Sequence, residues 1–490
     1  MAKTTCIRSA EWIVAWDGAA ERHVYLKDAD LVFSGDRIAF VGKGYRGAAD
    51  AVIEGRERCV VPGLVDIHSH PSSEPAYRGI REEHGVPQMH MTGLYERSLA
   101  FWPDAEGRAA AAEVAYCEML LSGVTAVADL SGTYPGWVEL AARSGLRVFL
   151  APAFASARWR LANEWQLDYR WDEPAGRQGF EAALALIDQI ARHPCGRLSG
   201  IVYPAQIDTC SAELLRDGAA AAKERRIPFT THCAQSVAEF NEMVRRHGKT
   251  PIQWASDLGI LGPGTILGHA IFTDEHSWTR WHTREDIRIL ADSGTSVAHC
   301  PTPFARYGQM LEDFGRYRRA GVNLGIGTDT APHNLLEEMR WAAVLARIAG
   351  RDITAVTTGD LLDAATVGGA RALGRHDIGR LAPGMKADLV LIDLKDAAMM
   401  PARDPLRSLV YTACERAVRD VYIDGVKVVD DRRVVTLDHA AALEALVEAQ
   451  RRMERLAPER DYRRRSAEEI APLSLPVSDG RNMPSGGAAG

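Results

Sequence analysis

The segment VVPGLVDIHSH, residues 60–70, decides the fold of this chain, because an apolar run ends there in two histidines separated by one residue. Side chains alternate between the two faces of a β-strand, so His68 and His70 are expected to point to the same side. The segment therefore predicts a buried strand that carries two imidazoles at its carboxyl end.

Seven further apolar runs follow, each after a stretch compatible with a helix. They are VTAVADL (124–130), LRVFLAPAF (146–154), GIVYPAQI (200–207), PFTTHC (228–233), TILGHAIF (265–272), TSVAHCP (295–301) and VNLGIGTD (322–329). Eight β/α units over roughly 300 residues are typical of a TIM barrel, and runs that are mostly apolar on both faces fit strands buried on both sides. The sequence therefore predicts an α/β fold, a TIM (β/α)8 barrel over residues 61–375. One helix is expected over 107–122, and another is expected to begin at Thr283, with Asp286 closing a variant capping box.

The two ends of the chain have a different sequence pattern from the predicted barrel. Residues 1–60 and 376–437 both contain short strands separated by turn residues such as Asp17-Gly18 and Gly35-Asp36. They predict one small β-sandwich domain assembled from both ends around the barrel. Residues 438–490 predict a helix that begins at His439, followed by a flexible tail. GKGYRG, residues 42–47, matches G-x-G-x-x-G, but a dinucleotide site needs a helix to begin there, and we interpret it as a turn.

Composition excludes several classes of protein. The chain has 490 residues, with 58 Lys and Arg against 65 Asp and Glu and a net charge of −7. The mild acidity and the lack of a basic block argue against nucleic acid as a partner. No apolar run approaches the ~18 residues of a membrane span, and eight scattered cysteines fit reduced thiols. We expect a cytoplasmic homo-oligomer that acts on a small molecule.

Histidines and one aspartate recur where the expected strands end. His232, His269, His299 and Asp329 each lie at the end of a different run. In a TIM barrel these ends form the face where catalytic groups converge. Imidazoles with one carboxylate suit Zn²⁺ or Fe²⁺ better than Ca²⁺ or Mg²⁺, which take mainly oxygen ligands.

Together these motifs resemble a known superfamily. PGLVDIHSH followed by Arg78-Gly79, with TTHCAQ, LGHAIF, VAHCPTP, GIGTDTAPHN and IGRLAPGMKADLVLIDL, resembles the amidohydrolases, in the branch of triazine hydrolases and cytosine and guanine deaminases. The stretch HSHPSSEP is similar to phenylurea and molinate hydrolases. The resemblance implies His68, His70, His232 and Asp329 as metal ligands. Binuclear relatives carry a lysine at the end of the fourth strand. The fourth strand of this chain lacks that lysine, so the resemblance implies one divalent transition metal per chain, zinc or alternatively iron.

The implied mechanism depends on two further side chains. Asp329 would take a proton from a water that the metal activates and return it to the leaving nitrogen, and His269 would support the developing oxygen charge. Deaminases of the branch carry H-x-x-E after the fifth strand, where this chain has Gln235. A glutamine cannot supply a proton at neutral pH. Glu239 is not expected to replace the missing glutamate, whereas Glu74 is a candidate.

The presence of Gln235 in place of the glutamate favours hydrolysis of a linear amide, urea or carbamate C–N bond, such as that of a phenylurea. The alternative is deamination of a guanine-, cytosine- or triazine-like ring, and a third hypothesis is a catalytically inactive binding barrel. The loop over residues 71–101 is expected to cover the pocket. Candidate substrate contacts are Arg78, His84, His90, Gln235 and His299, whereas Trp159, Trp165 and Trp171 are expected to serve in packing.

Overall fold

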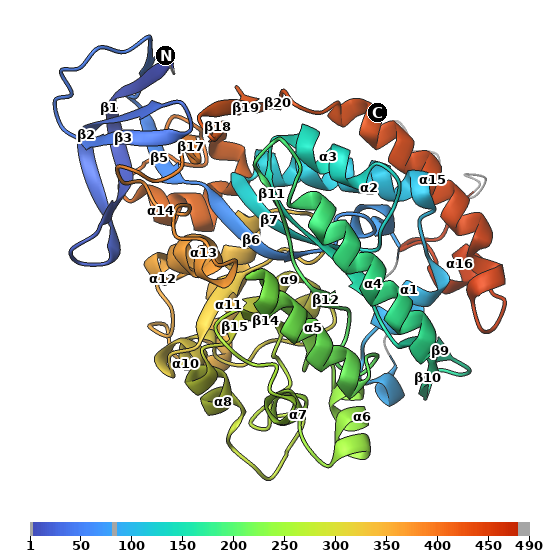
Figure 1. Cartoon of the computed structure of the whole chain (residues 1–490). Helices are drawn as coiled ribbons and strands as arrows, with labels where there is room; N and C mark the ends of the chain where they lie inside the picture. Colours follow the sequence, from blue (N-terminus) through green and yellow to red (C-terminus); the bar gives the residue numbers. More distant parts are fainter. Residues whose placement is uncertain (1–2, 81–85, 479–490) are drawn as a thin grey trace, which may run out of the picture.

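The computed structural model describes residues 3–80 and 86–478, and its centre is a barrel of parallel strands (Figure 1). Each of the eight expected apolar runs forms a strand. The strands are β6 (Leu64–Ser69), β7 (Val124–Ser131), β8 (Arg147–Phe154), the broken fourth strand β11 (Leu198–Gly200) and β12 (Tyr203–Pro204), β13 (Phe229–Cys233), β14 (Thr265–His269), β15 (Ser296–His299) and β16 (Asn323–Ile326). The TIM-barrel prediction is confirmed.

The barrel is built from two sheets rather than one continuous sheet. One has the order β11-β8-β7-β6, with β12 also on β8, and the other has the order β13-β14-β15-β16. Isolated parallel bridges join them at both seams. Ser69 pairs with Asp329 at one seam, and Val202 pairs with Phe229 and Gln206 with His232 at the other. Each seam therefore carries a residue that the sequence analysis assigns to the site.

The strands are apolar because both of their faces are covered. Every residue of β6, β7, β13, β14 and β15 is buried. Inside the barrel, Val65, Ile67, Phe149, Ile201 and Ile266 belong to one cluster of buried side chains. A packed interior leaves the carboxyl ends of the strands as the place where polar side chains can meet.

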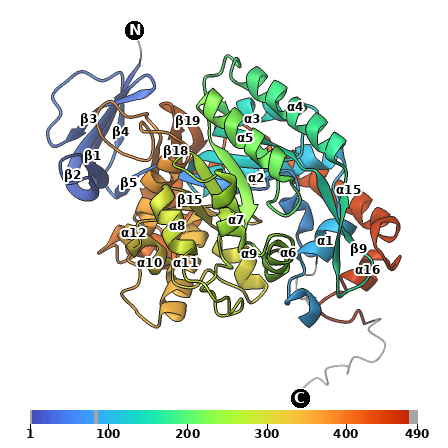
Figure 2. The same cartoon turned by 60° about the horizontal axis from the view of Figure 1, so that its bottom comes forward.

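Helices cover the outside of the barrel (Figures 1 and 2). They include α2 (Ala105–Leu121), α3 (Trp137–Ser144), α4 (Glu173–Ile190), α5 (Ala212–Arg225), α6 (Val237–His247), α7 (Pro251–Leu258), α8 (Asp286–Ser293), α10 (Phe314–Arg319), α11 (Leu335–Gly350) and α12 (Thr358–Asp363). The helix expected over 107–122 is α2, which begins two residues earlier because Asp104 accepts the amide of Gly107.

The two ends of the chain share one nine-stranded sheet (Figure 1). Its strands are β1 (Thr4–Asp17), β2 (Arg22–Ser34), β3 (Arg37–Gly42), β4 (Ala51–Glu54), β5 (Arg58–Pro62), β17 (Leu389–Asp393), β18 (Val418–Ile423), β19 (Val426–Asp430) and β20 (Arg433–Val434). The halves join where β5 pairs antiparallel with β17. Residues 43–47 form no helix between β3 and β4, as expected for a turn. The domain boundaries at residues 60, 376 and 437 stay a prediction.

The C-terminal helix α15 (His439–Arg460) lies beside α2. It is followed by α16 (Ala467–Ile470). Its buried residues Leu446, Met453 and Ala457 pack in one cluster with Tyr77 and Phe101 of the loop after β6. Within the described residues, no helix is both long and apolar enough to cross a membrane.

The expected start of the helix at Thr283 is wrong. Helix α8 begins at Asp286, and Thr283 donates its hydroxyl to Asp274 Oδ2 at 2.7 Å instead of capping the helix. Asp286 is fully buried, and its carboxylate accepts from Thr250 Oγ1 and from the amide of Asp274, both at 2.8 Å. A long-range network of side chains therefore replaces the local capping box.

Burial, and next the neighbouring Asp274, raise the pKa of Asp286 to about 7. Since this pKa exceeds the unfolded value of about 4, the stability that the protonated group contributes is lost as the pH rises through 7. Asp286→Asn should therefore gain stability relative to the parent between about pH 4 and pH 7. Urea unfolding midpoints across this range measure the gain. Asp292→Asn, an exposed change on the same helix, should give no such trend, and a flat D286N difference would contradict the prediction.

Candidate active site

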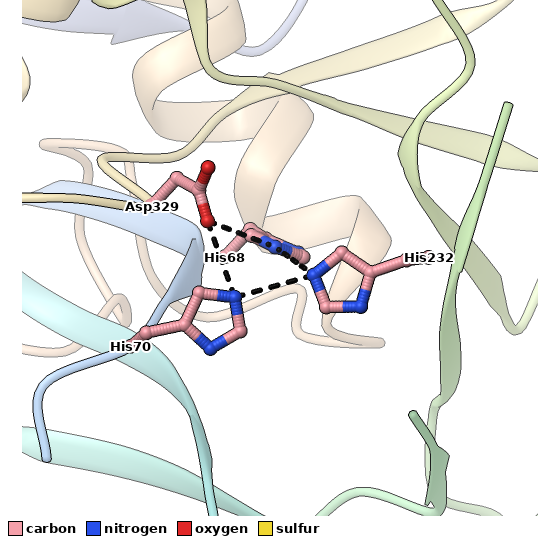
Figure 3. Close-up of side chains that lie close together, drawn as sticks. All are labelled: His68, His70, His232 and Asp329. Atoms are coloured by element: carbon pink, nitrogen blue, oxygen red, sulfur yellow. Dashed lines mark hydrogen bonds and ion pairs between the residues drawn. The ribbon is translucent and has the colours of Figure 1, made fainter. Parts of the chain in front are cut away.

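Four side chains converge at the carboxyl ends of β6, β13 and β16 (Figure 3). The Nε2 atoms of His68 and His70 lie 3.1 and 3.2 Å from Nε2 of His232. Oδ1 of Asp329 lies 3.5 Å from His68 Nε2 and 3.2 Å from His70 Nε2. One ligand atom from each residue thus lies within 4.8 Å of the others. The structure brings together the four residues that the sequence analysis names as metal ligands.

Hydrogen bonds on the far side of two imidazoles show what this cluster can hold. His70 Nδ1 donates to the carbonyl of Leu130 at 2.8 Å, and His232 Nδ1 donates to the carbonyl of Ala205 at 2.7 Å. A carbonyl only accepts, so in both neutral rings the proton is on Nδ1 and the Nε2 lone pairs face each other. Two lone pairs cannot hydrogen-bond, whereas a cation between them satisfies both. The residues fit a single divalent metal with nitrogen and oxygen ligands.

The backbone fixes the ligands of β6 and the loop after β16 against each other. The amide of Asp329 donates to the carbonyl of His68 at 2.9 Å, and the amide of His70 donates to the carbonyl of Asp329 at 3.2 Å. Buried Asp66 reinforces this link, since its carboxylate accepts from the amide of His68 and from the hydroxyl of Thr328. Asp66 was not among the predicted site residues, although a carboxylate inside a buried strand was a signal for it.

The charges of the cluster follow from burial and proximity. Burial alone would raise the pKa of Asp329, but His269, His68 and His70 hold it well below its usual value. Burial lowers the pKa of His269 well below its usual value. Nε2 of His269 lies 3.9 Å from Asp329 Oδ2. A carboxylate and an imidazole therefore lie side by side at the cluster, as expected for a proton acceptor and a group that supports an oxygen.

A cavity of about 900 Å³ opens onto this cluster. Its walls include the aromatic side chains of Phe154, Trp159, Tyr203, Phe304 and Tyr307. Trp159 therefore borders the cavity in addition to packing, and the expectation of packing alone is incomplete. Trp165 and Trp171 are 62% and 43% exposed.

Gln235, predicted as a substrate contact, lines the cavity and donates from Nε2 to Gln206 Oε1 at 2.5 Å. Glu239 does not substitute for a carboxylate at this position. Its two oxygens accept the amides of Ala234 and Gln235 at 2.6 and 3.0 Å. Burial, and next Asp208, raise the pKa of Glu239 to about 8. Glu239 shapes the loop after β13, and Gln235 and Ser236 are polar residues of that loop that border the cavity.

Three other predicted substrate contacts, Arg78, His90 and His299, are not among the described residues that line the main cavity. Arg78 lines a neighbouring cavity and pairs with Glu118. His90 is half-buried, and its Nε2 lies 3.3 Å from Asn241 Nδ2. His299 is buried with its ring 5.4 Å from that of Phe314, and burial lowers its pKa to about 3. His84 falls outside the described residues. The substrate roles of all four stay predictions.

A glycine next to the cluster gives a test of its geometry. A Cβ added at Gly268 would come within 2.5 Å of Cε1 of the His68 ring. Gly268→Ala should displace that imidazole and weaken metal retention by about 10- to 100-fold, as measured by elemental analysis after dialysis against a graded chelator. Gly262→Ala, just before the same strand, meets no atom within 4 Å and should retain the metal like the parent. Equal retention by G268A would mean that His68 is not a ligand.

Comparison with known proteins defines the class. Residues 59–428 match the Amidohydrolase family. The chain belongs to this family, and it is a metal-dependent hydrolase that acts on carbon–nitrogen bonds. It is 28% identical over 420 residues to a 5-methylthioadenosine/S-adenosylhomocysteine deaminase of Natronomonas pharaonis, covering 85% of this chain and 92% of the relative. It is also 28% identical over 441 residues to a 5'-deoxyadenosine deaminase of Methanosarcina mazei, covering 88% and 94%.

Solved structures agree with the family. An adenosine deaminase from Xanthomonas campestris with bound zinc superposes with a TM-score of 0.79 at 25% identity, covering 92% of this chain and 98% of that one. An atrazine chlorohydrolase from Arthrobacter aurescens with zinc has a TM-score of 0.79 at 26% identity, covering 91% and 100%. None of these relatives supports the phenylurea substrate expected from the sequence.

Proposed function

We propose that this protein is a zinc-dependent aminohydrolase that removes an amino group from an N-heterocycle of the adenine or triazine type. The observation that carries the proposal is the His68, His70, His232 and Asp329 cluster at an aromatic-walled cavity of about 900 Å³. Flat aromatic walls suit a planar ring, because offset and edge-on ring contacts are favourable. The nucleoside deaminases and the triazine ring hydrolase among its relatives support the same class of substrate.

The residues around the cluster have distinct roles in the proposed reaction. A divalent metal bound there would lower the pKa of a water molecule towards neutrality. Asp329 takes the proton of the attacking water and delivers it to the leaving nitrogen. His269 Nε2, on the Oδ2 side of Asp329, supports the charge on the developing oxygen. Gln235 binds a ring nitrogen by hydrogen bonding from the cavity wall but transfers no proton.

Gln235 also defines the second candidate. Without an acid to protonate the ring, only an electron-poor ring reacts readily, whereas a linear amide, urea or carbamate needs only the two transfers that Asp329 performs. Hydrolysis of such a linear bond is therefore retained as the alternative.

A product analysis separates the two. The zinc-loaded protein is incubated with adenosine, 5'-deoxyadenosine, guanine and aminotriazines, and separately with phenylureas, carbamates and anilides. Ammonia from a ring substrate supports the proposal, and free aniline from the linear set alone supports the alternative. Turnover of neither set, with zinc bound, would overturn both.

Restoring a carboxylate tests the role of Gln235. Gln235→Glu should raise ring deamination by about 10²-fold, because the new side chain can protonate the ring. Its zinc content should equal that of the parent. Steady-state ammonia release measures the deamination rate, and elemental analysis measures the zinc content. Gln206→Glu is the matched control, because Gln206 is the hydrogen-bond partner of Gln235. A loss of zinc in Q235E would mean that this position contacts the metal.

A further inference from the structure

Three arginines give the lining of the main cavity positive charge. Arg108, Arg158 and Arg460 all line it, and they come from α2, from β9 (Ala157–Leu161) and from the last residue of α15. Within residues 3–80 and 86–478, none of the three has a carboxylate at ion-pair distance. The neighbouring Asp104 is bound by Arg452, at 2.6 and 2.9 Å. Three guanidinium groups thus border one cavity without an acidic partner.

Two of these arginines meet at one tryptophan. The guanidinium of Arg108 lies over the ring of Trp102, 5.2 Å from its centroid, and Arg460 Nη1 donates to the carbonyl of Trp102 at 2.7 Å. Trp102 itself lines the cavity and is 45% exposed. Arg108 Nη1 also donates to the carbonyl of Thr133 at 3.5 Å. Stacking and one backbone hydrogen bond for each arginine hold both side chains while leaving donors of each guanidinium unused. Figures 1 and 2 show α15 passing beside α2, which explains how a C-terminal residue reaches the cavity.

Other charged groups of the cavity are already paired. Asp329 belongs to the metal cluster, and buried Arg97 is paired with Glu74. Burial lowers the pKa of Arg460, and the nearby carboxylates of Asp104 and Glu459 compensate for its charge only in part. An anionic group of a ligand would supply that compensation, and a planar carboxylate matches the guanidinium fork.

We propose that Arg108 and Arg460, together with Arg158, form a subsite for a carboxylate on the substrate, remote from the bond that is cleaved. This inference rests on the proposed function, since it extends the same cavity. It restricts the substrate to a heterocycle with an acidic substituent, and it assigns to the C-terminal helix a direct part in selecting that substrate.

The test measures binding rather than turnover, so that it does not depend on the reaction. The probes are phenylalkanoates with two to six methylene groups and the corresponding primary amides, titrated calorimetrically into the zinc-loaded full-length protein. For the best chain length, the acid should bind at least about 10-fold more tightly than its amide, a preference that added salt reduces. The double variant Arg108→Gln/Arg460→Gln should lose most of this preference. Arg158→Gln should reduce it to a smaller extent, because Arg158 is exposed.

Arg451→Gln is the matched control, since Arg451 is on the same helix but pairs with Glu448 at the surface. It should keep the full preference for the acid. Two results would overturn the proposal: equal binding of acid and amide to the parent, or an acid preference that survives in the double variant, which would place the carboxylate at the metal. A failure of the proposed function would appear separately, as no ammonia from any ring.

Discussion

Replacing Asp329 with asparagine should lower kcat by about 10³-fold, because the residue that accepts and returns the proton is lost. Asparagine is the sharpest change at this position. Asp329 adopts a left-handed backbone with φ of 58°, which asparagine tolerates far better than most residues, so the loop keeps its shape. Single-turnover measurements on the best substrate determine the rate of the chemical step.

Zinc content must be measured in parallel, because Asp329 is also a proposed ligand. An amide oxygen is a weaker ligand than a carboxylate, and we expect reduced zinc retention that excess zinc restores without restoring kcat. Asp188→Asn, an exposed change on α4 that loses only its pair with Arg225, should keep the activity of the parent. A zinc-loaded D329N protein with most of its kcat would transfer the role of the base to another residue.

The largest expected loss of stability comes from Arg147→Met. Arg147 is 1% exposed at the start of β8, and its Nη2 lies 3.1 Å from Asp388 Oδ2 and 2.8 Å from Asp424 Oδ1. These carboxylates belong to the nine-stranded sheet, next to β17 and in the β18–β19 turn. Removing the cation leaves a fully buried carboxylate without compensation, which costs about 3–5 kcal/mol in the free energy of unfolding.

Urea and thermal unfolding of the zinc-loaded protein measure this loss. The double variant Arg147→Met/Asp388→Asn should recover part of it, because the uncompensated charge is gone. Arg143→Met, whose partner Glu113 is at the surface, should change stability by less than about 0.5 kcal/mol. An unchanged midpoint for R147M would mean that the barrel and the sheet are not held together by this pair.

The sequence predicted the strands and the metal cluster because both depend on local patterns. Apolar runs buried on both faces identify barrel strands, and a histidine that ends such a run must lie near the others at the same rim. This geometry places His68, His70, His232, His269, His299 and Asp329 at one rim, and the resemblance to the amidohydrolases implied which four of them are metal ligands. The composite sheet was predictable for a similar reason, since both ends of the chain have the same sequence pattern of short strands and turns.

The rest depends on contacts between distant segments. Nothing near Arg108 in the sequence indicates that it lines the same cavity as Arg460, and both residues contact Trp102 because α15 packs beside α2. Thr283 bonds to Asp274 rather than to its own helix, which a local capping rule cannot foresee. The preference for a linear substrate was derived from Gln235 and from the stretch HSHPSSEP, and the relatives support the ring alternative better than this preference.

The shared sheet also constrains the order in which the protein can fold during synthesis. β5 pairs with β17, and these strands are more than 300 residues apart in the chain. The edge of β5 that β17 covers therefore remains unpaired until the whole barrel has been translated. Pairing across so large a separation is slow, and an exposed edge can pair with another chain. We expect nascent chains that stop before residue 389 to need protection from aggregation, even when every residue of the metal cluster has already been made.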